Sequence, residues 1–217
     1  MAADTATIWQ RLRDRWRHRV LLQEILNRLS RIGIGLHPYT VFEEAVATAD
    51  TAPSATDLAC RRLAAGDLPA ASAIAGRPVP VQRLQARLDE GQIGIGAFEG
   101  DTCVSYTWAD LGQFHGLGAA VSQRQLLPHE AFLYDAYTAP AMRGRAIVPV
   151  VRAALYYELA AVGRTRLLSV SQYFNRPARR FKLKLGAREI ETRLYLHIGS
   201  FVQRDWRLSR GAADVTA

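Results

Sequence analysis

Two consecutive strands joined by a glycine turn place the strongest limit on how this chain can fold. Residues 92–98 and 102–108 carry aromatic and β-branched side chains, and Glu99, Gly100 and Asp101 lie between them, as in a β-hairpin. A purely parallel, doubly wound sheet does not accommodate two consecutive antiparallel strands. Later in the chain strands and helices alternate, at residues 131–138, 145–162, 166–171 and 175–185. The sequence therefore predicts an α/β fold built on a sheet of mixed direction.

Apolar periodicity and capping residues predict the remaining elements. A helix should begin beside the capping residues Ser54 and Asp57 and end near Gly66. The other expected elements are a strand at 37–44, helical turns at 81–88, and closing strands at 189–198 and 201–208. We expect an amphipathic helix over residues 1–34, one folded domain over 35–210, and a flexible tail over 211–217.

The segment from residue 8 to residue 32 has apolar residues at three- and four-residue steps, as an amphipathic helix has. Residues 1–31 also hold seven arginines against three acidic residues. One interpretation is a helix that lies on an anionic membrane surface. The other is a helix packed on its own domain or on a partner subunit, as in a homodimer, with its arginines in water.

Composition excludes several classes of protein. Of the 217 residues, 49% are hydrophobic and 22% charged, which is typical of globular proteins and not of disordered ones. Cys60 and Cys103 are the only cysteines and form neither a disulfide framework nor a zinc cluster, so we expect no metal. No stretch approaches the ~20 apolar residues of a membrane span. We expect a cytoplasmic protein, or one bound peripherally at the inner membrane face.

The net charge of +8 indicates attraction to polyanions, which include nucleic acid, anionic lipid and phosphorylated cofactors. A basic nucleic-acid-binding module would use residues 8–32 and a second basic patch at 176–188. The sequence contains no recognition motif for nucleic acid and no interleaved stacking aromatics, so this is the weaker alternative.

A cluster of glycines resembles a dinucleotide-binding fingerprint only superficially. Gly91, Gly94, Gly96 and Gly100 lie within and after an extended segment, whereas the fingerprint must follow a strand and open a helix. These glycines are better explained by a strand with a bulge and a hairpin turn.

A better candidate for an anion site lies where the strand at 131–138 leads into the helix at 145–162. The junction carries Arg143, Gly144, Arg145 and Ala146. A helix N-terminus presents free amide groups and the positive end of the helix dipole. Glycine lets the backbone approach a diphosphate closely, and the two arginines add positive charge.

This junction and a later block together identify a family. Gly144-Arg145-Ala146 matches the second half of the pattern Q/R-x-x-G-x-G/A, whose first position falls on Ala141 and so departs from it. The later block contains Asn175, Ala178, Phe181 and Lys184-Leu185-Gly186. With both blocks, residues 131–189 resemble the GNAT superfamily of acyl-CoA-dependent N-acyltransferases. The resemblance implies a mostly antiparallel central sheet flanked by helices, with splayed central strands.

The resemblance also implies a cleft for acetyl-CoA, or another acyl-CoA, where the strands at 131–138 and 166–171 part. The backbone of Tyr137 and Thr138 would pair with the pantetheine arm, and Asn175 would contact that arm or order the strand. The diphosphate would be held by six consecutive residues: Met142, Arg143, Gly144, Arg145, Ala146 and Ile147. The 3′-phosphate would be reached by four cations, which could instead form a solvated helix face: Arg176, Arg179, Arg180 and Lys182.

In this family an amine attacks a thioester directly, which requires a proton acceptor and a proton donor. The family often places a donor tyrosine seven residues after the asparagine, but Lys182 occupies that position here, so the usual assignment fails. Tyr173 is the substitute candidate, unless it only packs in the cleft wall. Asp135, inside an apolar strand, is the candidate general base or anchor for the acceptor ammonium. A structural hydrogen bond is the alternative explanation for Asp135.

The function implied is transfer of an acyl group, most simply acetyl, from CoA to a primary amine. His115 and His129 flank a glycine-rich loop at 112–118, which would border the acceptor site. A membrane-associated acyltransferase acting on a lipid-linked amino sugar is the alternative, with residues 8–32 as its membrane contact.

Overall fold

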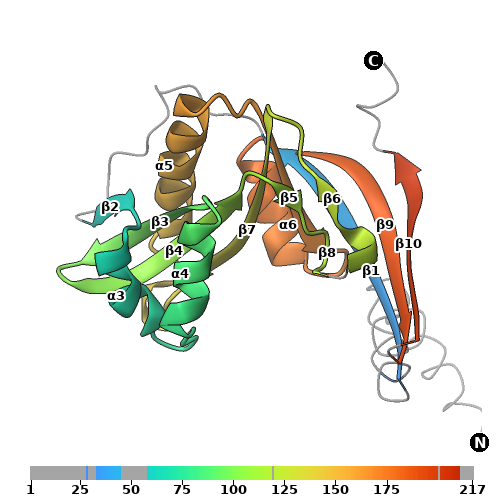
Figure 1. Ribbon diagram of the computed structural model, residues 1–217, viewed down its shortest axis with the longest axis horizontal. Helices are drawn as coiled ribbons and strands as arrows, with labels where there is room; N and C mark the ends of the chain where they lie inside the picture. The colour runs from blue at the N-terminus through green and yellow to red at the C-terminus, as the bar shows by residue number, and fades with distance from the viewer. Residues whose placement is uncertain (1–27, 29–32, 45–57, 119, 200, 211–217) are drawn as a thin grey trace, which may run out of the picture.

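The computed structural model describes residues 28, 33–44, 58–118, 120–199 and 201–210. Its main sheet has eight strands in the order β10-β9-β1-β8-β7-β4-β3-β2 (Figure 1). These strands are β1 (Ile34–Glu44), β2 (Ala59–Arg62), β3 (Ile93–Glu99), β4 (Thr102–Asp110), β7 (Glu130–Thr138), β8 (Arg166–Gln172), β9 (Arg188–Ile198) and β10 (Val202–Arg210). A second, two-stranded sheet pairs β5 (Gln113–Phe114) with β6 (Arg124–Gln125).

The described helices cover both faces of the sheet. They are η2 (Ala65–Asp67), α3 (Leu68–Ser72), α4 (Val81–Asp89), η3 (Ala120–Ser122), η4 (Pro140–Met142), α5 (Ile147–Ala161) and α6 (Arg176–Lys184). The Thr107 hydroxyl of β4 accepts a hydrogen bond from Arg152 of α5. The ring of the next residue, Trp108, contacts the Arg87 guanidinium of α4. Because consecutive strand residues point to opposite faces, α4 and α5 lie on opposite sides of the sheet.

The predicted mixed, mostly antiparallel sheet flanked by helices is confirmed. Among the described strand pairs only β7 and β8 are parallel, and α5 is the helix that connects them, as a parallel crossover requires. The hairpin predicted at 92–108 is present as β3 and β4. Gly100, in its turn, has φ +59°, a conformation that glycine adopts without strain.

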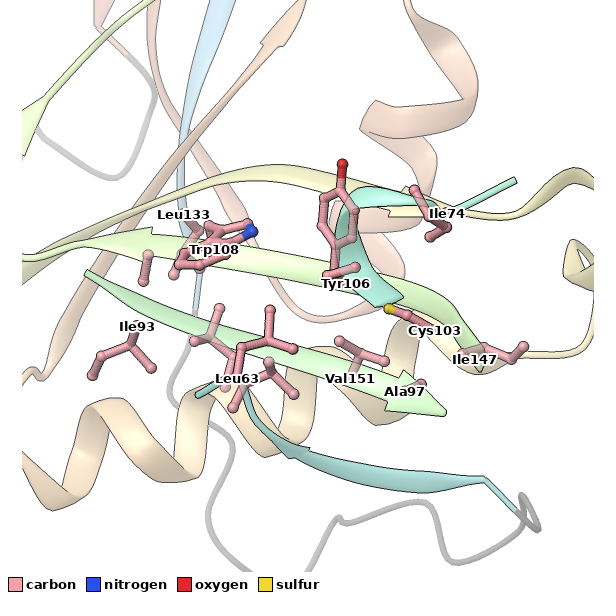
Figure 2. Close-up of a cluster of buried hydrophobic side chains, with 14 of the residues drawn as sticks. Leu63, Ile74, Ile93, Ala97, Cys103, Tyr106, Trp108, Leu133, Ile147 and Val151 are labelled. Atoms are coloured by element: carbon pink, nitrogen blue, oxygen red, sulfur yellow. The ribbon is translucent and has the colours of Figure 1, made fainter. Parts of the chain in front are cut away.

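The core is built around this hairpin. In Figure 2, Tyr106 and Trp108 rise from one face of β4, whereas Val151, on α5, lies on the other side of the strands. A Cβ added at Gly94 would lie 2.9 Å from the Trp108 ring. The glycines of β3 therefore permit close packing inside the sheet, in agreement with a strand and not a dinucleotide loop.

The helix predicted between residue 57 and Gly66 is wrong. Residues 59–62 form β2, which pairs with β3 in four consecutive registers, and the Arg61 guanidinium lies 3.8 Å from the centre of the Phe98 ring. Pairing with a distant strand overrides the helical preference of alanine, leucine and arginine in this segment.

Two predictions fall largely or wholly outside the described residues: the amphipathic helix at 8–32 and the tail at 211–217. The domain boundaries at 34 and 210 therefore stay predictions. No helix of the described part of the chain is long and apolar enough to cross a membrane.

The position of β1 could not be expected from chain order. This first strand lies between β8 and β9 and is antiparallel to both. Tyr39 and Val41 of β1 are buried in a second apolar cluster with Phe132 and Leu168. The insertion also places Glu44, the last residue of β1, opposite Leu167 in the middle of the sheet.

Candidate active site

The parallel strands β7 and β8 pair over four residues and then separate. Their register runs from Glu130 opposite Arg166 to Leu133 opposite Ser169, while β7 continues to Thr138 and β8 to Gln172. The register of β7 against β4 also shifts in this region, where Asp135 has φ +50°. A bulge of this kind bends one strand away from its neighbour. The predicted splaying of the central strands is therefore confirmed, and residues beyond Leu133 and Ser169 line the two sides of the split.

The turn that follows β7 presents free backbone amides. Gly144 has φ +83° and Ala146 has φ +53°, and α5 begins at the next residue, Ile147. Within the described part of the chain, no carbonyl accepts from the amides of residues 144–146. A Cβ at Gly144 would meet no atom within 4 Å. Left-handed residues and free amides at a helix N-terminus form an open concavity suited to an anion.

The side chains around this turn divide into anchors and exposed cations. Met142 and Ile147 are buried, so they fix the turn and offer a ligand only their backbone. Arg143 and Arg145 are exposed. The Arg143 Nε atom donates to the Thr138 carbonyl at 3.3 Å, which folds this guanidinium back along β7.

The two β7 residues assigned to the pantetheine arm already have internal partners. The Tyr137 hydroxyl donates to the Ala75 carbonyl at 3.1 Å, and the Tyr137 carbonyl accepts from the Ser105 hydroxyl at 2.9 Å. Thr138 shares a 2.8 Å hydrogen bond with the same serine hydroxyl. A carbonyl oxygen has two lone pairs, so these bonds leave room for the predicted contacts.

The residues predicted at the start of α6 are joined to one another. The Asn175 Oδ1 atom accepts from the Ala178 amide at 3.2 Å and so caps the helix. Arg179 binds Glu189 at 2.6 Å and the Tyr173 carbonyl at 2.9 Å, and its guanidinium lies 4.7 Å from the centre of the Tyr173 ring. Contact between Arg179 and a 3′-phosphate stays a prediction, and it requires these bonds to be exchanged.

Asp135 lies in the β7 bulge and is paired with two arginines. Arg77 and Arg87 each place a guanidinium nitrogen 2.6 Å from the Asp135 carboxylate, and this side chain is 5% exposed. The angles at these nitrogens are those of ion pairs and not of hydrogen bonds. These ion pairs account for a carboxylate in this apolar strand. The group borders a surface cavity of about 260 Å³ that Arg83 and Tyr134 also line. A role for Asp135 as a general base stays a prediction.

The histidines near the glycine-rich loop are not equivalent. The His115 Nε2 atom lies 2.7 Å from the Asp110 carboxylate, and two loop amides bind the same carboxylate. These contacts hold His115 in place, whereas His129 contributes its backbone carbonyl to two amides at the start of β8. Within the described residues, no group of three or more His, Cys, Asp or Glu side chains is arranged for a metal ion.

A buried charged cluster joins β1, α5, β8 and α6, and no sequence pattern predicted it. Its members are Glu44, Arg152, Tyr156, Ser169 and Lys182. The carboxylate of Glu44 accepts from Tyr156 and Ser169 and lies 3.3 Å from Arg152. Although burial acts to raise it, the pKa of Glu44 is lowered, because Arg152, Lys182 and the donated hydrogen bonds stabilise the anion.

Lys182 is therefore not part of a solvated helix face, and its predicted reach to a 3′-phosphate is wrong. Its side chain is 8% exposed and points into the sheet, where the ammonium donates to Ser169 at 2.6 Å and to the Val170 carbonyl at 2.9 Å. Burial lowers the pKa of Lys182 to about 7, an effect that Glu44 opposes and Arg152 reinforces.

Neither a protein-family model nor a curated protein sequence matches the chain. Solved structures do. A GNAT-family protein from Novosphingobium aromaticivorans is 17% identical with a TM-score of 0.53 over 76% of this chain. A tandem GNAT protein of the clavulanic acid biosynthesis pathway is 14% identical with a TM-score of 0.55 over 80%. The chain spans 66% and 58% of the lengths of these two proteins. At such low identity the likeness concerns the fold alone, and it agrees with the split between β7 and β8: the chain has the fold of the GNAT superfamily.

Proposed function

We propose that this protein is an acyl-CoA-dependent N-acyltransferase that transfers an acyl group, most simply acetyl, to a primary amine. The observation that carries the proposal is the split between β7 and β8 beside the open turn at residues 144–146. A split alone is a defect in a sheet, and an anion site alone is common. Side by side, they offer one place for a diphosphate and another for the arm attached to it.

The dimensions of the split suit this use. Thr138 lies five residues beyond the last paired residue, Leu133, which is about 17 Å of strand at 3.3–3.4 Å per residue. That length is comparable with an extended pantetheine arm. With its diphosphate on the amides of residues 144–146, an acyl-CoA would bring its thioester to the closed end of the split.

The chemistry requires little beyond this placement. The neutral amine of the acceptor attacks the thioester carbonyl carbon, a C–N bond forms, and the C–S bond breaks as the sulfur takes the electron pair. Holding both reactants in line accounts for a large part of the rate increase in such reactions. The GNAT fold of the solved structures supports the same assignment.

The test compares two glycines at opposite ends of α5. Gly144 and Gly163 have φ +83° and +76°, and a Cβ at either would meet no atom within 4 Å. Gly144→Leu and Gly163→Leu therefore carry similar backbone strain, about 1–2 kcal/mol. Only the first places a side chain where the diphosphate would lie.

We expect wild-type protein and Gly163→Leu to bind acetyl-CoA with similar dissociation constants in isothermal titration calorimetry. Gly144→Leu should bind at least about tenfold more weakly, because it loses more than 1.4 kcal/mol of binding free energy. Equal dissociation constants for the two variants would show that the turn at residues 144–146 does not bind acetyl-CoA. Wild-type protein that does not bind acetyl-CoA at millimolar concentration would refute the proposed function.

A further inference from the structure

A lysine ammonium is buried at the closed end of the split. Ser169, to which Lys182 donates, is the last residue of β8 that pairs with β7. The second acceptor, the carbonyl of Val170, lies one residue further along, where β8 has already left β7. Lys182 thus reaches from α6 to the point at which the two strands separate.

The charges around Lys182 do not balance when it is protonated. Glu44 is the anion of the cluster, and Arg152 is its nearer cation, at 3.3 Å against 3.9 Å for Lys182. Arginine keeps its charge at every accessible pH, so Glu44 is already neutralised without the lysine. Tyr156 donates to the same carboxylate, and burial together with Glu44 raises its pKa, which keeps the phenol protonated.

Lys182 can therefore lose its proton without leaving an unpaired anion. The neutral state has one carboxylate and one guanidinium, and the protonated state has one additional buried cation. Burial disfavours that additional charge, which is why the pKa of Lys182 falls to about 7. An ordinary lysine is protonated at that pH and holds its proton firmly.

We propose that Lys182 is the proton donor to the departing sulfur in the reaction inferred above. The assignment rests on the proposed function, because it needs a thioester lying in the split. The chain's other lysine, Lys184, is exposed on the same helix and has no part in the reaction.

The step balances as follows. As the C–S bond breaks, its electron pair stays on sulfur, and one N–H bond of the Lys182 ammonium breaks to form S–H. The products of that transfer are the free thiol of CoA and a neutral Lys182 amine. The nitrogen of the new amide releases one proton to solvent, and Lys182 regains one from solvent before the next turnover. A donor whose pKa is near the working pH can both give and recover its proton.

The first test needs no variant of Lys182. Protein labelled with ¹³C at the lysine ε-carbon gives two side-chain signals, because the chain has two lysines, and Lys184→Arg assigns them. In an NMR titration, we expect the Lys182 signal to change with a midpoint near pH 7. Added CoA should shift the Lys182 signal and leave that of Lys184 in place. A Lys182 signal that CoA does not move would overturn the proposal.

The second test separates proton donation from positive charge. Lys182→Arg keeps a cation that cannot give up its proton, and Lys182→Met removes the charge but keeps an unbranched side chain. Thiol release from acetyl-CoA is measured with the primary amine that reacts fastest in a screen. We expect kcat to fall about 100-fold or more in both variants, within the usual range for a lost acid catalyst. Lys184→Met should retain the wild-type kcat.

The pH profile provides a readout that a structural role would not change. In wild-type protein kcat should decline as pH rises through the Lys182 pKa, and this decline should be absent from Lys182→Arg. Calorimetry should show acetyl-CoA binding by both Lys182 variants within about threefold of wild type. Wild-type activity in Lys182→Arg would overturn the role of Lys182 but leave the proposed function intact. Wild-type protein that neither binds acetyl-CoA nor releases thiol would overturn both.

Discussion

The lowered pKa of Lys182 makes a quantitative prediction about how stability depends on pH. The pKa is about 7 in the folded protein, and its ordinary value, expected in the unfolded chain, is 10.5. Between these two values the unfolded chain binds a proton that the folded protein does not. The free energy of unfolding must therefore rise with pH in this window. Below about pH 7, the lowered pKa of Lys182 destabilises the folded protein most. Integrating the linkage relation from pH 7 to pH 9 gives a gain of about 2 kcal/mol.

The perturbation that isolates this gain is Lys182→Met. The substitution also removes two hydrogen bonds, but their loss is nearly independent of pH and cancels when the two pH values are compared. Urea unfolding, followed by tryptophan fluorescence, gives the free energy of unfolding of both proteins at pH 7 and pH 9. The difference, wild type minus variant, should increase by about 2 kcal/mol. A difference that stays constant within about 0.5 kcal/mol would refute a lowered pKa in the folded protein, and Lys184→Met is the control.

Three further substitutions test the ion pairs and the packing of the sheet. Glu44→Gln should cost about 3 kcal/mol of unfolding free energy, because it leaves the buried Arg152 without its counter-ion. Glu43→Gln should cost less than about 1 kcal/mol, because that carboxylate is 23% exposed. Urea midpoints for the two variants check the contrast. Gly96→Ala places a Cβ 2.8 Å from Leu63 and should cost about 1–3 kcal/mol, measured as a lowered melting temperature in calorimetry.

The local parts of the fold could be predicted because each is specified by neighbouring residues. A turn glycine between two extended segments gave the β3–β4 hairpin, and Pro149 lies in the first turn of α5, where its missing amide proton is not needed. The end of β7, the turn at Gly144 and the cap at Asn175 follow one another along the chain, so a motif could join them. The splayed sheet was then expected from the family resemblance.

Elements whose structure depends on residues far away in the sequence could not be predicted from their own residues. β1 pairs with β8 across more than 100 residues of sequence, for example Tyr39 with Gln172. Residues 37–44 alone predict a strand but do not distinguish a central position from an edge position. The helix predicted over 59–62 is wrong for the same reason, since pairing with β3, and not composition, makes this segment extended. Charge patterning failed at Lys182, which lies in a basic run but is bonded to the cluster around Glu44. It also did not predict the ion pair between Arg179 and Glu189.

Lys182 nevertheless left a signal in the sequence. Ala178 and Lys182 are four residues apart, so they lie on one face of α6, and from that face the Lys182 ammonium reaches β8. A buried cation is either paired or functional, and pairing with Glu44 does not explain why the cation is a lysine. In this chain 26 of 28 basic residues are arginines, and arginine binds carboxylates in a better geometry. An arginine at 182 would provide the charge but not a proton that can leave, so the lysine at the end of the split is best explained by the proton.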